Sequence, residues 1–419
     1  MSDDAFWAEA LASAEAEDAA DPLREMRARF ALPPGVIYLD GNSLGPAPTA
    51  ALAELDRAAR DEWARDLITS WNRAGWFDLP SVCGDLIAPI VGADRGEVVA
   101  CDTTSLNIFK ALHAALGMRP DRGVIVAESA GFPTDLYVAE GVCATRPGAS
   151  LQLEGRDGPD LIELIDADVA AVLVNQVDYR TGRLRDVAAV TARAHAVGAL
   201  AVWDLCHSAG VMEVGLNAAG ADLAVGCSYK YLNGGPGAPA FVFAARRHQA
   251  AIRQPLSGWW GHARPFAFAP EFAPDAGIRK FLCGTQPILS FRAMQAGLAM
   301  FAEASLAEIR RKSVALTGRF IALTEATLAP FGVGLLSPGA AAERGSQVSL
   351  THPEGYAVVQ AMIARGVIGD FRMPDVMRFG FAPLYVGHAD VARAARTLHQ
   401  VLATEAWAEP RYRARAAVV

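Results

Sequence analysis

Two segments of the sequence place reactive side chains directly after apolar, strand-like runs. The run at residues 201–203 leads into Asp204, and His207 follows three residues later. The run at residues 223–227 leads through Ser-Tyr into Lys230, and a glycine-rich loop comes next. Taken alone, Asp204 could cap the following helix and Lys230 could be an exposed loop lysine. A lysine at the end of a buried strand is costly, however, unless it is paired or modified.

Together the two segments supply the groups that pyridoxal-phosphate (PLP) chemistry requires. PLP enzymes carry the cofactor as a Schiff base on a lysine and place a carboxylate against the pyridine nitrogen. The carboxylate keeps that nitrogen protonated, so the ring can accept electrons from the substrate Cα. Asp204 on one strand end and Lys230 on a following one would supply both at the same edge of a sheet. This arrangement resembles the fold-type-I PLP enzymes, the aspartate-aminotransferase-like superfamily.

The elements that would position these residues alternate from about residue 96 onward. Short apolar runs lie at residues 123–127, 170–174, 200–204, 223–227 and 240–244, with helical patterns between several of them, such as 184–197. Alternating strands and helices indicate an α/β fold with a mainly parallel sheet covered on both faces. Ligands of such sheets bind at the carboxyl ends of the strands.

The chain is expected to form a large PLP-binding domain over residues 46–295 and a smaller α+β domain. A helical pattern covers the first thirty residues and ends near Pro33-Pro34-Gly35. We expect residues 1–45 to pack with the small domain. Residues 296–419 comprise a connecting helix and the small C-terminal domain. The connecting helix belongs to a long pattern over residues 287–328, which one helix or two interrupted helices would satisfy.

The composition restricts the class of protein. The 419 residues are 52% apolar and 20% charged with a net charge of −8, which fits a two-domain globular protein and argues against nucleic-acid or anionic-membrane partners. The acidic N-terminus does not resemble a signal peptide, and no uncharged apolar run approaches membrane-spanning length. The six cysteines are not spaced as metal ligands, so free thiols in a cytoplasmic protein without a metal site are expected.

Eight ordered segments carry a closer resemblance, which extends over nearly the whole chain. They are YLDGNSLGP (38–46), DTTSLNIFKAL (102–112), FPTDLY (132–137), WDLCHSAG (203–210), GCSYKYLNGGPG (226–237), GWWGH (258–262), FLCGTQPIL (281–289) and RFGFAPLY (378–385). Through these segments the chain resembles the kynureninase family. The combination of SYKYLNGGPG with GWWGH separates it from the cysteine desulfurases, which are related enzymes.

The resemblance implies a set of cofactor-binding residues. Thr104 and Ser105 would bind the phosphate at a helix N-terminus, although a simple N-cap is the structural alternative. Phe132 would stack on the pyridine ring, with a core phenylalanine as the alternative. Asp135 lies in the same loop, and Asn175 ends a strand at the same edge.

Further cofactor contacts follow from the same resemblance. Asp204 would face the pyridine nitrogen with His207 beside it, Lys230 would carry the cofactor, and Tyr229 would contact the phosphate and take part in proton transfer. Trp259 and Thr285 would reach the site from the partner subunit of a homodimer.

The resemblance also implies the substrate and the reaction. Arg378 would bind the substrate α-carboxylate, a task that suits a bidentate guanidinium, with a surface salt bridge as the alternative. Trp71 is a candidate for lining the substrate pocket. The implied reaction is hydrolytic Cβ–Cγ cleavage of L-kynurenine to anthranilate and L-alanine, in tryptophan degradation and NAD-related metabolism, with 3-hydroxykynurenine as a second candidate substrate.

Two alternative functions stay open at this point. A cysteine desulfurase needs a nucleophilic cysteine on a flexible polar loop, whereas the cysteines here lie in apolar surroundings. A PLP-binding regulator would normally add a DNA-binding domain, and no basic helix-turn-helix segment is visible. A scaffold without activity would be expected to lose Lys230 or Asp204.

Overall fold

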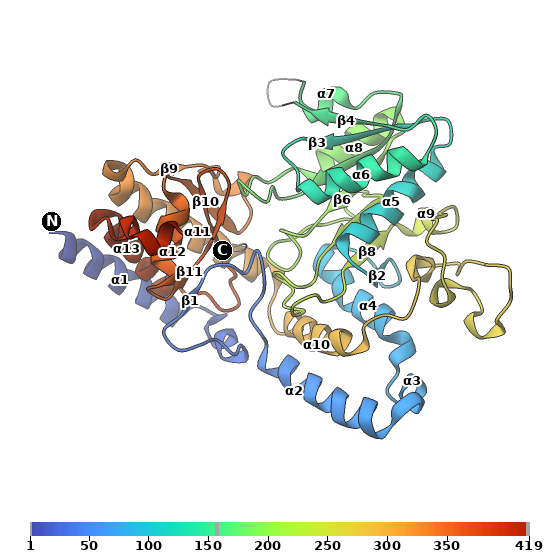
Figure 1. The fold of residues 1–419 in the computed structure, drawn as a ribbon, viewed down its shortest axis with the longest axis horizontal. Coiled ribbons are helices and arrows are strands. Elements are labelled where there is room, and N and C mark those ends of the chain that lie inside the picture. The colour runs from blue at the N-terminus through green and yellow to red at the C-terminus, as the bar shows by residue number, and fades with distance from the viewer. Residues whose placement is uncertain (1, 156–158, 416–419) are drawn as a thin grey trace. The chain divides into compact units, whose positions relative to one another are not determined.

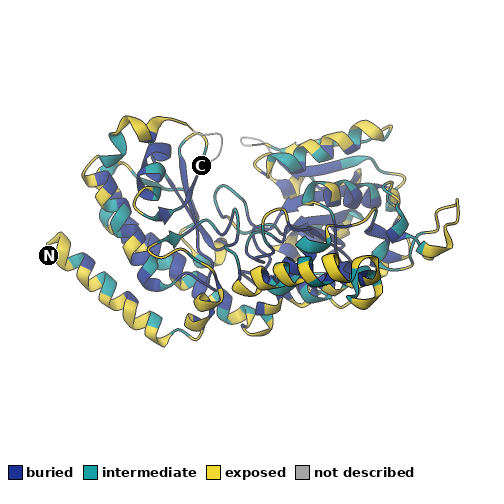
Figure 2. Cartoon of the chain, turned by 60° about the horizontal axis from the view of Figure 1, so that its bottom comes forward, coloured by how far each residue is buried: buried dark blue, intermediate teal, exposed yellow. Residues whose placement is uncertain are grey.

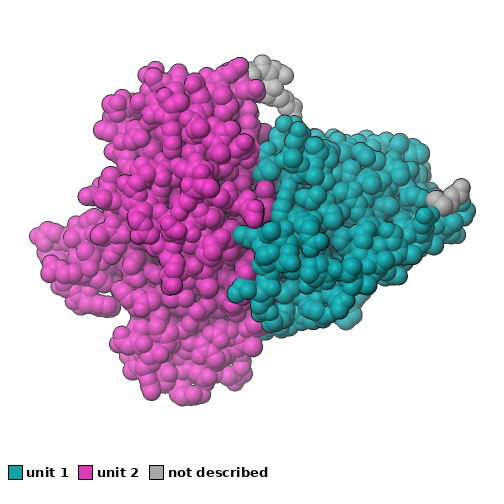
Figure 3. Space-filling model, turned by 180° about the vertical axis from the view of Figure 1, so that it is seen from behind, with its two compact units in different colours: residues 1–49, 179–184, 302–419 teal, residues 50–178, 185–301 magenta. Residues whose placement is uncertain are grey.

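The computed structural model describes residues 2–155 and 159–415, and it divides the chain into two compact units. Unit 1 comprises residues 1–49, 179–184 and 302–419, and unit 2 comprises residues 50–178 and 185–301 (Figure 3). Unit 1 therefore combines both ends of the chain with a six-residue segment from its middle.

Unit 2 is built on a seven-stranded sheet with the strand order β2-β8-β7-β6-β5-β3-β4 (Figure 1). Its strands are β2 (Val98–Ala100), β3 (Val124–Glu128), β4 (Ser150–Glu154), β5 (Val169–Asn175), β6 (Leu200–Asp204), β7 (Leu223–Gly226) and β8 (Phe241–Ala244). All neighbouring pairs are parallel except the two that involve β8, which is antiparallel to both β2 and β7. The sheet is thus mainly parallel, and only β8 runs against the rest.

Helices pack on this sheet and extend from it. They are α2 (Thr49–Arg57), α3 (Ser70–Arg73), α4 (Leu79–Val91), α5 (Thr104–Met118), α6 (Pro133–Thr145), α7 (Leu161–Leu164), α8 (Val187–Val197), α9 (Arg246–Gln249) and α10 (Ile288–Ala299). A π-helical segment, Ala58–Arg65, continues α2. Helices α5 and α6 pack against each other, α8 packs on β5 and β6, and α4 packs on β2 and α10.

The core of unit 2 explains why these residues form these elements. Strands β5, β6, β7 and β8 are buried at every position, as continuous apolar runs in a mainly parallel sheet should be (Figure 2). Trp203 is fully buried in β6, and its indole N–H donates to Thr191 Oγ1 at 3.1 Å. The helices, in contrast, retain exposed outer faces (Figure 2).

Unit 1 contains a four-stranded antiparallel sheet with the order β12-β13-β10-β9 and a two-stranded parallel sheet of β1 and β11. Its strands are β1 (Ile37–Tyr38), β9 (Gly334–Leu335), β10 (Gln347–Thr351), β11 (Val367–Ile368), β12 (Asp370–Arg372) and β13 (Val376–Gly380). Its helices are α1 (Asp3–Ala20), α11 (Leu306–Leu328), α12 (Gly355–Ile363), α13 (His388–Ala403) and α14 (Pro410–Arg413). Helix α13 packs against α1, α11 and α12.

One helical pattern ends earlier than the sequence-based expectation, and a second, for which one helix or two were expected, consists of two. The first helix stops at Ala20 rather than near Pro33, because Asp21 precedes Pro22 and adopts an extended conformation. A 3₁₀ segment, Arg24–Arg29, follows it. The long pattern over residues 287–328 is divided into α10 and α11, and Ser305 caps the second helix by accepting from the N–H of Glu308. Among the described residues, no helix is both long enough and apolar enough to cross a membrane.

Candidate active site

A pocket of about 290 Å³ lies in unit 2 at the carboxyl ends of the parallel strands. Asn175 and Asp204 end β5 and β6 and are partners in the parallel register, so their side chains are neighbours. Nine of the predicted residues line this pocket: Thr104, Ser105, Phe132, Asp135, Asn175, Asp204, His207, Tyr229 and Lys230.

A buried amide holds two carboxyl groups together at the base of the pocket. The Nδ2 of Asn175 donates to Asp135 Oδ2 and to Asp204 Oδ2, each at 3.0 Å, and its Oδ1 accepts from the N–H of Phe132 at 3.2 Å. Burial and the adjacent Asp204 carboxyl raise the pKa of Asp135 well above its ordinary value. Burial and the neighbouring carboxyl thus favour the protonated form of Asp135.

Lys230 extends from the segment after β7 into the same pocket. Its Nζ lies 2.8 Å from Nε2 of His207, and 6.0 Å from the ring centroids of both Phe132 and Tyr229. A neutral imidazole nitrogen can accept a hydrogen bond from an ammonium group, so His207 can hold the amine in place without adding a second charge. We call Asp135, Asn175, Asp204, His207 and Lys230 the strand-end cluster.

The loop around Lys230 is fixed by its own hydrogen bonds. The N–H of Gly234 donates to the carbonyl of Ser228 at 2.9 Å, and Ser228 Oγ donates to the carbonyl of Pro239 at 2.6 Å. The N–H of Asn233 donates to the carbonyl of Lys230 at 3.0 Å, and Asn233 has a positive φ of 55°. A tight, closed loop of this kind holds the backbone of Lys230 in one place at the carboxyl ends of the parallel strands.

The N-terminus of α5 forms another wall of the pocket. Thr103 is the N-cap, because its Oγ1 accepts from the N–H of Leu106, and Thr104 and Ser105 occupy the first turn. Thr104 Oγ1 lies 3.6 Å from the sulfur of Cys206. Hydroxyl groups and backbone N–H groups at the positive end of a 15-residue helix are suited to bind an anion such as a phosphate.

Sequence reasoning missed several residues that line this pocket: Thr103, Thr134, Cys206, Gly237, Ala238 and Ala240. The sequence pattern predicts Thr104 and not Thr103, because a cap position cannot be located to one residue by pattern alone. Thr134 lies inside the FPTDLY segment, and Cys206 lies inside WDLCHSAG, so their proximity to predicted residues was the available signal.

Three predicted residues lie elsewhere in unit 2. Trp71 packs edge-on against Trp259 and Trp260, with ring centroids 5.7 and 5.3 Å away, and it does not line the pocket. Trp259 stacks on Trp260 at 5.2 Å. Thr285 is exposed. None of these three side chains is among the residues that line the pocket.

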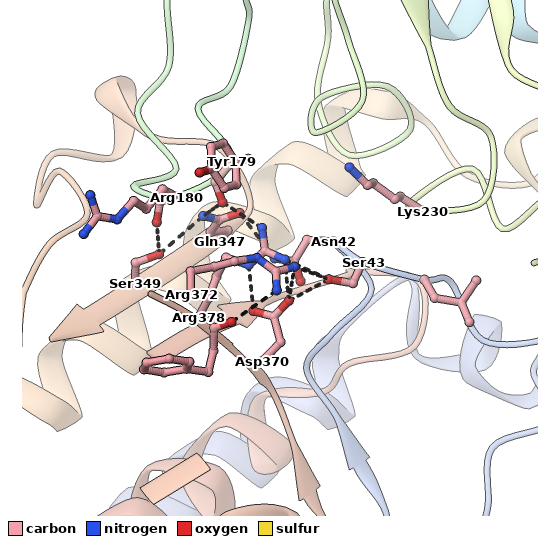
Figure 4. A network of polar contacts seen from close by, with 12 residues as sticks. Asn42, Ser43, Tyr179, Arg180, Lys230, Gln347, Ser349, Asp370, Arg372 and Arg378 are labelled. Atoms are coloured by element: carbon pink, nitrogen blue, oxygen red, sulfur yellow. Dashed lines mark hydrogen bonds and ion pairs between the residues drawn. The ribbon is translucent and has the colours of Figure 1, made fainter. Parts of the chain in front are cut away.

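Unit 1 contains a second buried polar network, centred on Arg378 (Figure 4). Arg378 lies on β13 directly opposite Asp370 on β12, and it is 1% exposed. Its Nε donates to Asp370 Oδ1 at 2.8 Å, and its Nη2 donates both to Asp370 Oδ2 and, at 2.7 Å, to Ser43 Oγ. Its Nη1 donates to the carbonyl of Tyr179 at 2.7 Å. Such burial rules out a surface salt bridge.

A second guanidinium shares the same carboxylate. Nη2 of Arg372 lies 2.7 Å from Asp370 Oδ2. Burial would raise the pKa of Asp370, but the hydrogen bonds and charge of Arg378, with the charge of Arg372, hold it below its ordinary value. Burial and the nearby Asp370 raise the pKa of Asp40 to about 7. We call Ser43, Tyr179, Asp370, Arg372 and Arg378 the arginine cluster.

Comparison with known proteins decides the family. Kynureninases from Burkholderia pseudomallei are 52% identical to this chain over 406 residues, covering 96% of the chain and 97% of the relative. A kynureninase from Pseudomonas fluorescens is 50% identical over 407 residues, with the same coverage. Residues 309–398 match the family described as the kynureninase C-terminal domain. The chain belongs to the kynureninase family.

Solved structures show that this member of the kynureninase family shares its fold with other fold-type-I enzymes. The apo structure of a cysteine desulfurase from Thermococcus onnurineus superposes with a TM-score of 0.75 at 18% identity, covering 91% of this chain and 98% of that one. A mutant of C-DES with glycine covalently linked to the PLP cofactor gives a TM-score of 0.76 at 15% identity, covering 89% and 98%. At these identities the likeness concerns the fold alone, and it confirms the predicted fold class.

Proposed function

We propose that this member of the kynureninase family binds PLP at Lys230 and hydrolyses the Cβ–Cγ bond of L-kynurenine, giving anthranilate and L-alanine in tryptophan catabolism. The observation that carries the proposal is the pocket in unit 2, where Lys230, Asp204 and the N-terminus of α5 face one cavity. These are an amine, a carboxyl group and an anion site, which are the three groups that PLP requires from a protein.

The pocket residues have distinct tasks in this reaction. PLP, when bound, supplies an electron sink for the charge that develops at the substrate Cα. Asp204, held by Asn175, would keep a proton on the pyridine nitrogen. Nζ of Lys230 would accept the Cα proton, and Tyr229 would act as acid and base in the later proton transfers. Thr104 and Ser105 would hold the phosphate at the start of α5.

Arg378 would bind the α-carboxylate of the substrate. Asp370, Ser43 and the Tyr179 carbonyl hold its guanidinium in one orientation through four hydrogen bonds, so a positive charge of fixed position would attract the substrate carboxylate. A residue fixed before binding loses little side-chain entropy when the substrate arrives.

A homodimer with shared active sites is part of the proposal. Unit 2 exposes large apolar side chains in the segment that follows Trp259, and Phe266 and Phe268 are 64% and 85% exposed. Exposed aromatic groups of this size are usually covered by a partner surface. A partner copy would bury them and would bring its Trp259 and Thr285 to the site. Sedimentation at assay concentration would test this, and a fully active monomer would contradict it.

Six free cysteines suit a reducing cytoplasm as the place of the reaction.

The deciding experiment incubates the protein with PLP and L-kynurenine and follows anthranilate by its fluorescence. A parallel incubation replaces kynurenine with L-cysteine, adds dithiothreitol to reduce any persulfide, and measures sulfide. The proposal expects anthranilate and alanine in equal amounts, with little or no sulfide. Sulfide without anthranilate would favour the cysteine desulfurase alternative, and neither product would contradict both enzymatic assignments.

A further inference from the structure

Two cysteines lie next to one another beneath the cofactor pocket, and the proposed reaction uses neither. Cys206 follows β6 and lines the pocket, while Cys227 follows β7 and is 2% exposed. Strands β6 and β7 are adjacent and parallel, with Asp204 opposite Val225. Cys206 and Cys227 each lie two residues beyond this pair, past the ends of both strands, so the same register would bring them opposite one another.

The contacts between the two residues are direct. The N–H of Cys227 donates to the sulfur of Cys206 at 3.2 Å, and the thiol of Cys227 lies 3.9 Å from the carbonyl oxygen of Cys206. Neighbouring strands are about 4.8 Å apart, which falls inside the range of Cα separations that a disulfide spans, roughly 4.4–6.8 Å. The strand spacing therefore permits a disulfide between them.

The electrostatic surroundings favour a reactive thiol in this pair. Burial alone would raise the pKa of Cys227, but its hydrogen bond with the Cys206 thiol and the charge of Lys230 lower it below the ordinary thiol value. The same hydrogen bond, together with burial, raises the pKa of Cys206. One sulfur can therefore ionise while its neighbour keeps a proton, as a nucleophilic attack followed by disulfide closure requires.

We propose that Cys206 and Cys227 form a redox-sensitive dithiol that hydroperoxides oxidise to a disulfide at the base of the pocket. After a proton passes from Cys206 to Cys227, the Cys206 thiolate, which lines the pocket, attacks the peroxide oxygen; this gives a sulfenic acid and releases an alcohol, or water when the oxidant is hydrogen peroxide. The second thiol then displaces water and closes the sulfur–sulfur bond. The two sulfurs lose two electrons in total, the peroxide gains them, and a dithiol reductant reverses the change.

Closure would disturb Thr104 and Asp204, which line the pocket, and the backbone of Cys227. The sulfur of Cys206 would leave its contact with Thr104 Oγ1, now at 3.6 Å, and the N–H of Cys227 would lose its acceptor. The N–H of Cys206 donates to Asp204 Oδ1 at 2.7 Å, so a shift of this residue also moves the hydrogen bond that orients Asp204. Oxidation should therefore weaken PLP binding. This effect rests on the proposed function, whereas disulfide formation itself does not.

The test treats the full-length protein with hydrogen peroxide, with and without added PLP, and counts thiols after unfolding. The proposal expects the loss of two thiols, a mass lower by two hydrogen atoms, and a peptide that joins residues 206 and 227. Dithiothreitol should restore both thiols. PLP fills the pocket that Cys206 lines, so it should slow the oxidation. The oxidised protein should bind PLP about tenfold more weakly, measured by equilibrium dialysis.

Matched variants separate this pair from the other thiols. Cys206→Ser and Cys227→Ser should each abolish the linked peptide, whereas Cys143→Ser, which changes a partly exposed cysteine on α6, should leave it unchanged. If a serine variant fails to fold, phenylarsine oxide provides a second measurement on the unchanged chain, because it bridges two neighbouring thiols. Peroxide that yields only unlinked sulfinic acids, or a linked peptide containing other cysteines, would overturn the proposal.

Discussion

The strand-end cluster in unit 2 and the arginine cluster in unit 1 are both buried polar networks, but they are built differently. In unit 2, the carboxyl ends of adjacent parallel strands bring Asn175 and Asp204 side by side, and the cluster faces a cavity of about 290 Å³. In unit 1, Asp370 and Arg378 are opposite one another at one end of the antiparallel β12–β13 pair. There the guanidinium donates to two side chains and one backbone carbonyl.

The difference fits the roles proposed for the two clusters, which are reaction in unit 2 and orientation of the substrate in unit 1. Lys230 lies beside a histidine nitrogen and two aromatic rings and lines the pocket, so a ligand in the pocket can reach its amine. Arg378 is paired with a carboxylate whose pKa is held low, so its position and its charge are both constant. Substitutions in the first cluster should abolish chemistry, whereas substitutions in the second should weaken substrate binding.

The largest effect is expected from Lys230→Ala. Without the amine, the protein should lose the visible absorption of lysine-bound PLP and all measurable turnover, while circular dichroism shows an unchanged fold. Spectra and an anthranilate assay measure both properties. A cofactor that borohydride still fixes to the protein of this variant would show that another residue carries it.

Arg378→Ala should raise the KM for kynurenine strongly and leave PLP bound. Removing one partner of a buried charge-assisted pair costs roughly 2–5 kcal/mol. Steady-state kinetics and PLP dialysis measure the two effects, and Arg365→Ala, which changes an exposed arginine of the same unit, is the control. Weaker PLP binding with normal kynurenine binding would erase the distinction between the two clusters.

Thr285 belongs to neither cluster, and it should set the preference between kynurenine and 3-hydroxykynurenine. Threonine offers one short hydroxyl group, so a buried ring hydroxyl of the substrate would be poorly satisfied, at a cost of about 1–3 kcal/mol. We expect kcat/KM to favour kynurenine by about tenfold. Thr285→Asn should reduce that ratio, because its longer amide can donate and accept. Equal specificity constants in the unchanged protein would show that a bound water fills the gap.

The smallest effect concerns Asp40, which lies beside the arginine cluster. Its surroundings include Tyr38, Ser43, Asp370, Arg372 and Arg378, and burial followed by Asp370 raises its pKa to about 7. Above this pH it adds a negative charge near Arg378, so the KM for kynurenine should rise a few-fold, by roughly 1 kcal/mol or less. In Asp40→Asn the rise should disappear, and in Asp4→Asn, at an exposed position of α1, it should persist.

The same carboxyl affects stability with a definite sign. Its pKa in the folded protein lies above the ordinary value of 3.8, so ionisation opposes folding. The stability that the protonated group contributes is present below about pH 4 and is lost as the pH rises to about 7. Urea unfolding of the unchanged protein and of Asp40→Asn at several pH values would measure this. Parallel curves for the two proteins would contradict the assignment.

Whether a site residue could be predicted from the sequence depended on its position relative to the strands. Asp204 and Lys230 follow apolar strands directly, so strand periodicity located them at one sheet edge, and the pocket contains both. Asp370 was missed because its partner is fixed by hairpin register, which residue types do not reveal. Cys206 was not predicted as a pocket residue, because its position beside Cys227 depends on the pairing between β6 and β7. The roles predicted for Trp259 and Thr285 require a partner subunit, so they stay predictions.

The division of the chain between the units has a consequence for biosynthesis. The segments of unit 2 lie between residues 50 and 301, whereas unit 1 joins residues 1–49 to residues 302–419. Strand β1 pairs with β11 and α1 packs on α13, so these partners are separated by more than 300 residues. On a ribosome, the sheet of unit 2 can form while the N-terminal helix still lacks its partners. Contacts of such sequence separation form slowly, so assembly of unit 1 should be the last step of folding and the one that most needs protection from aggregation.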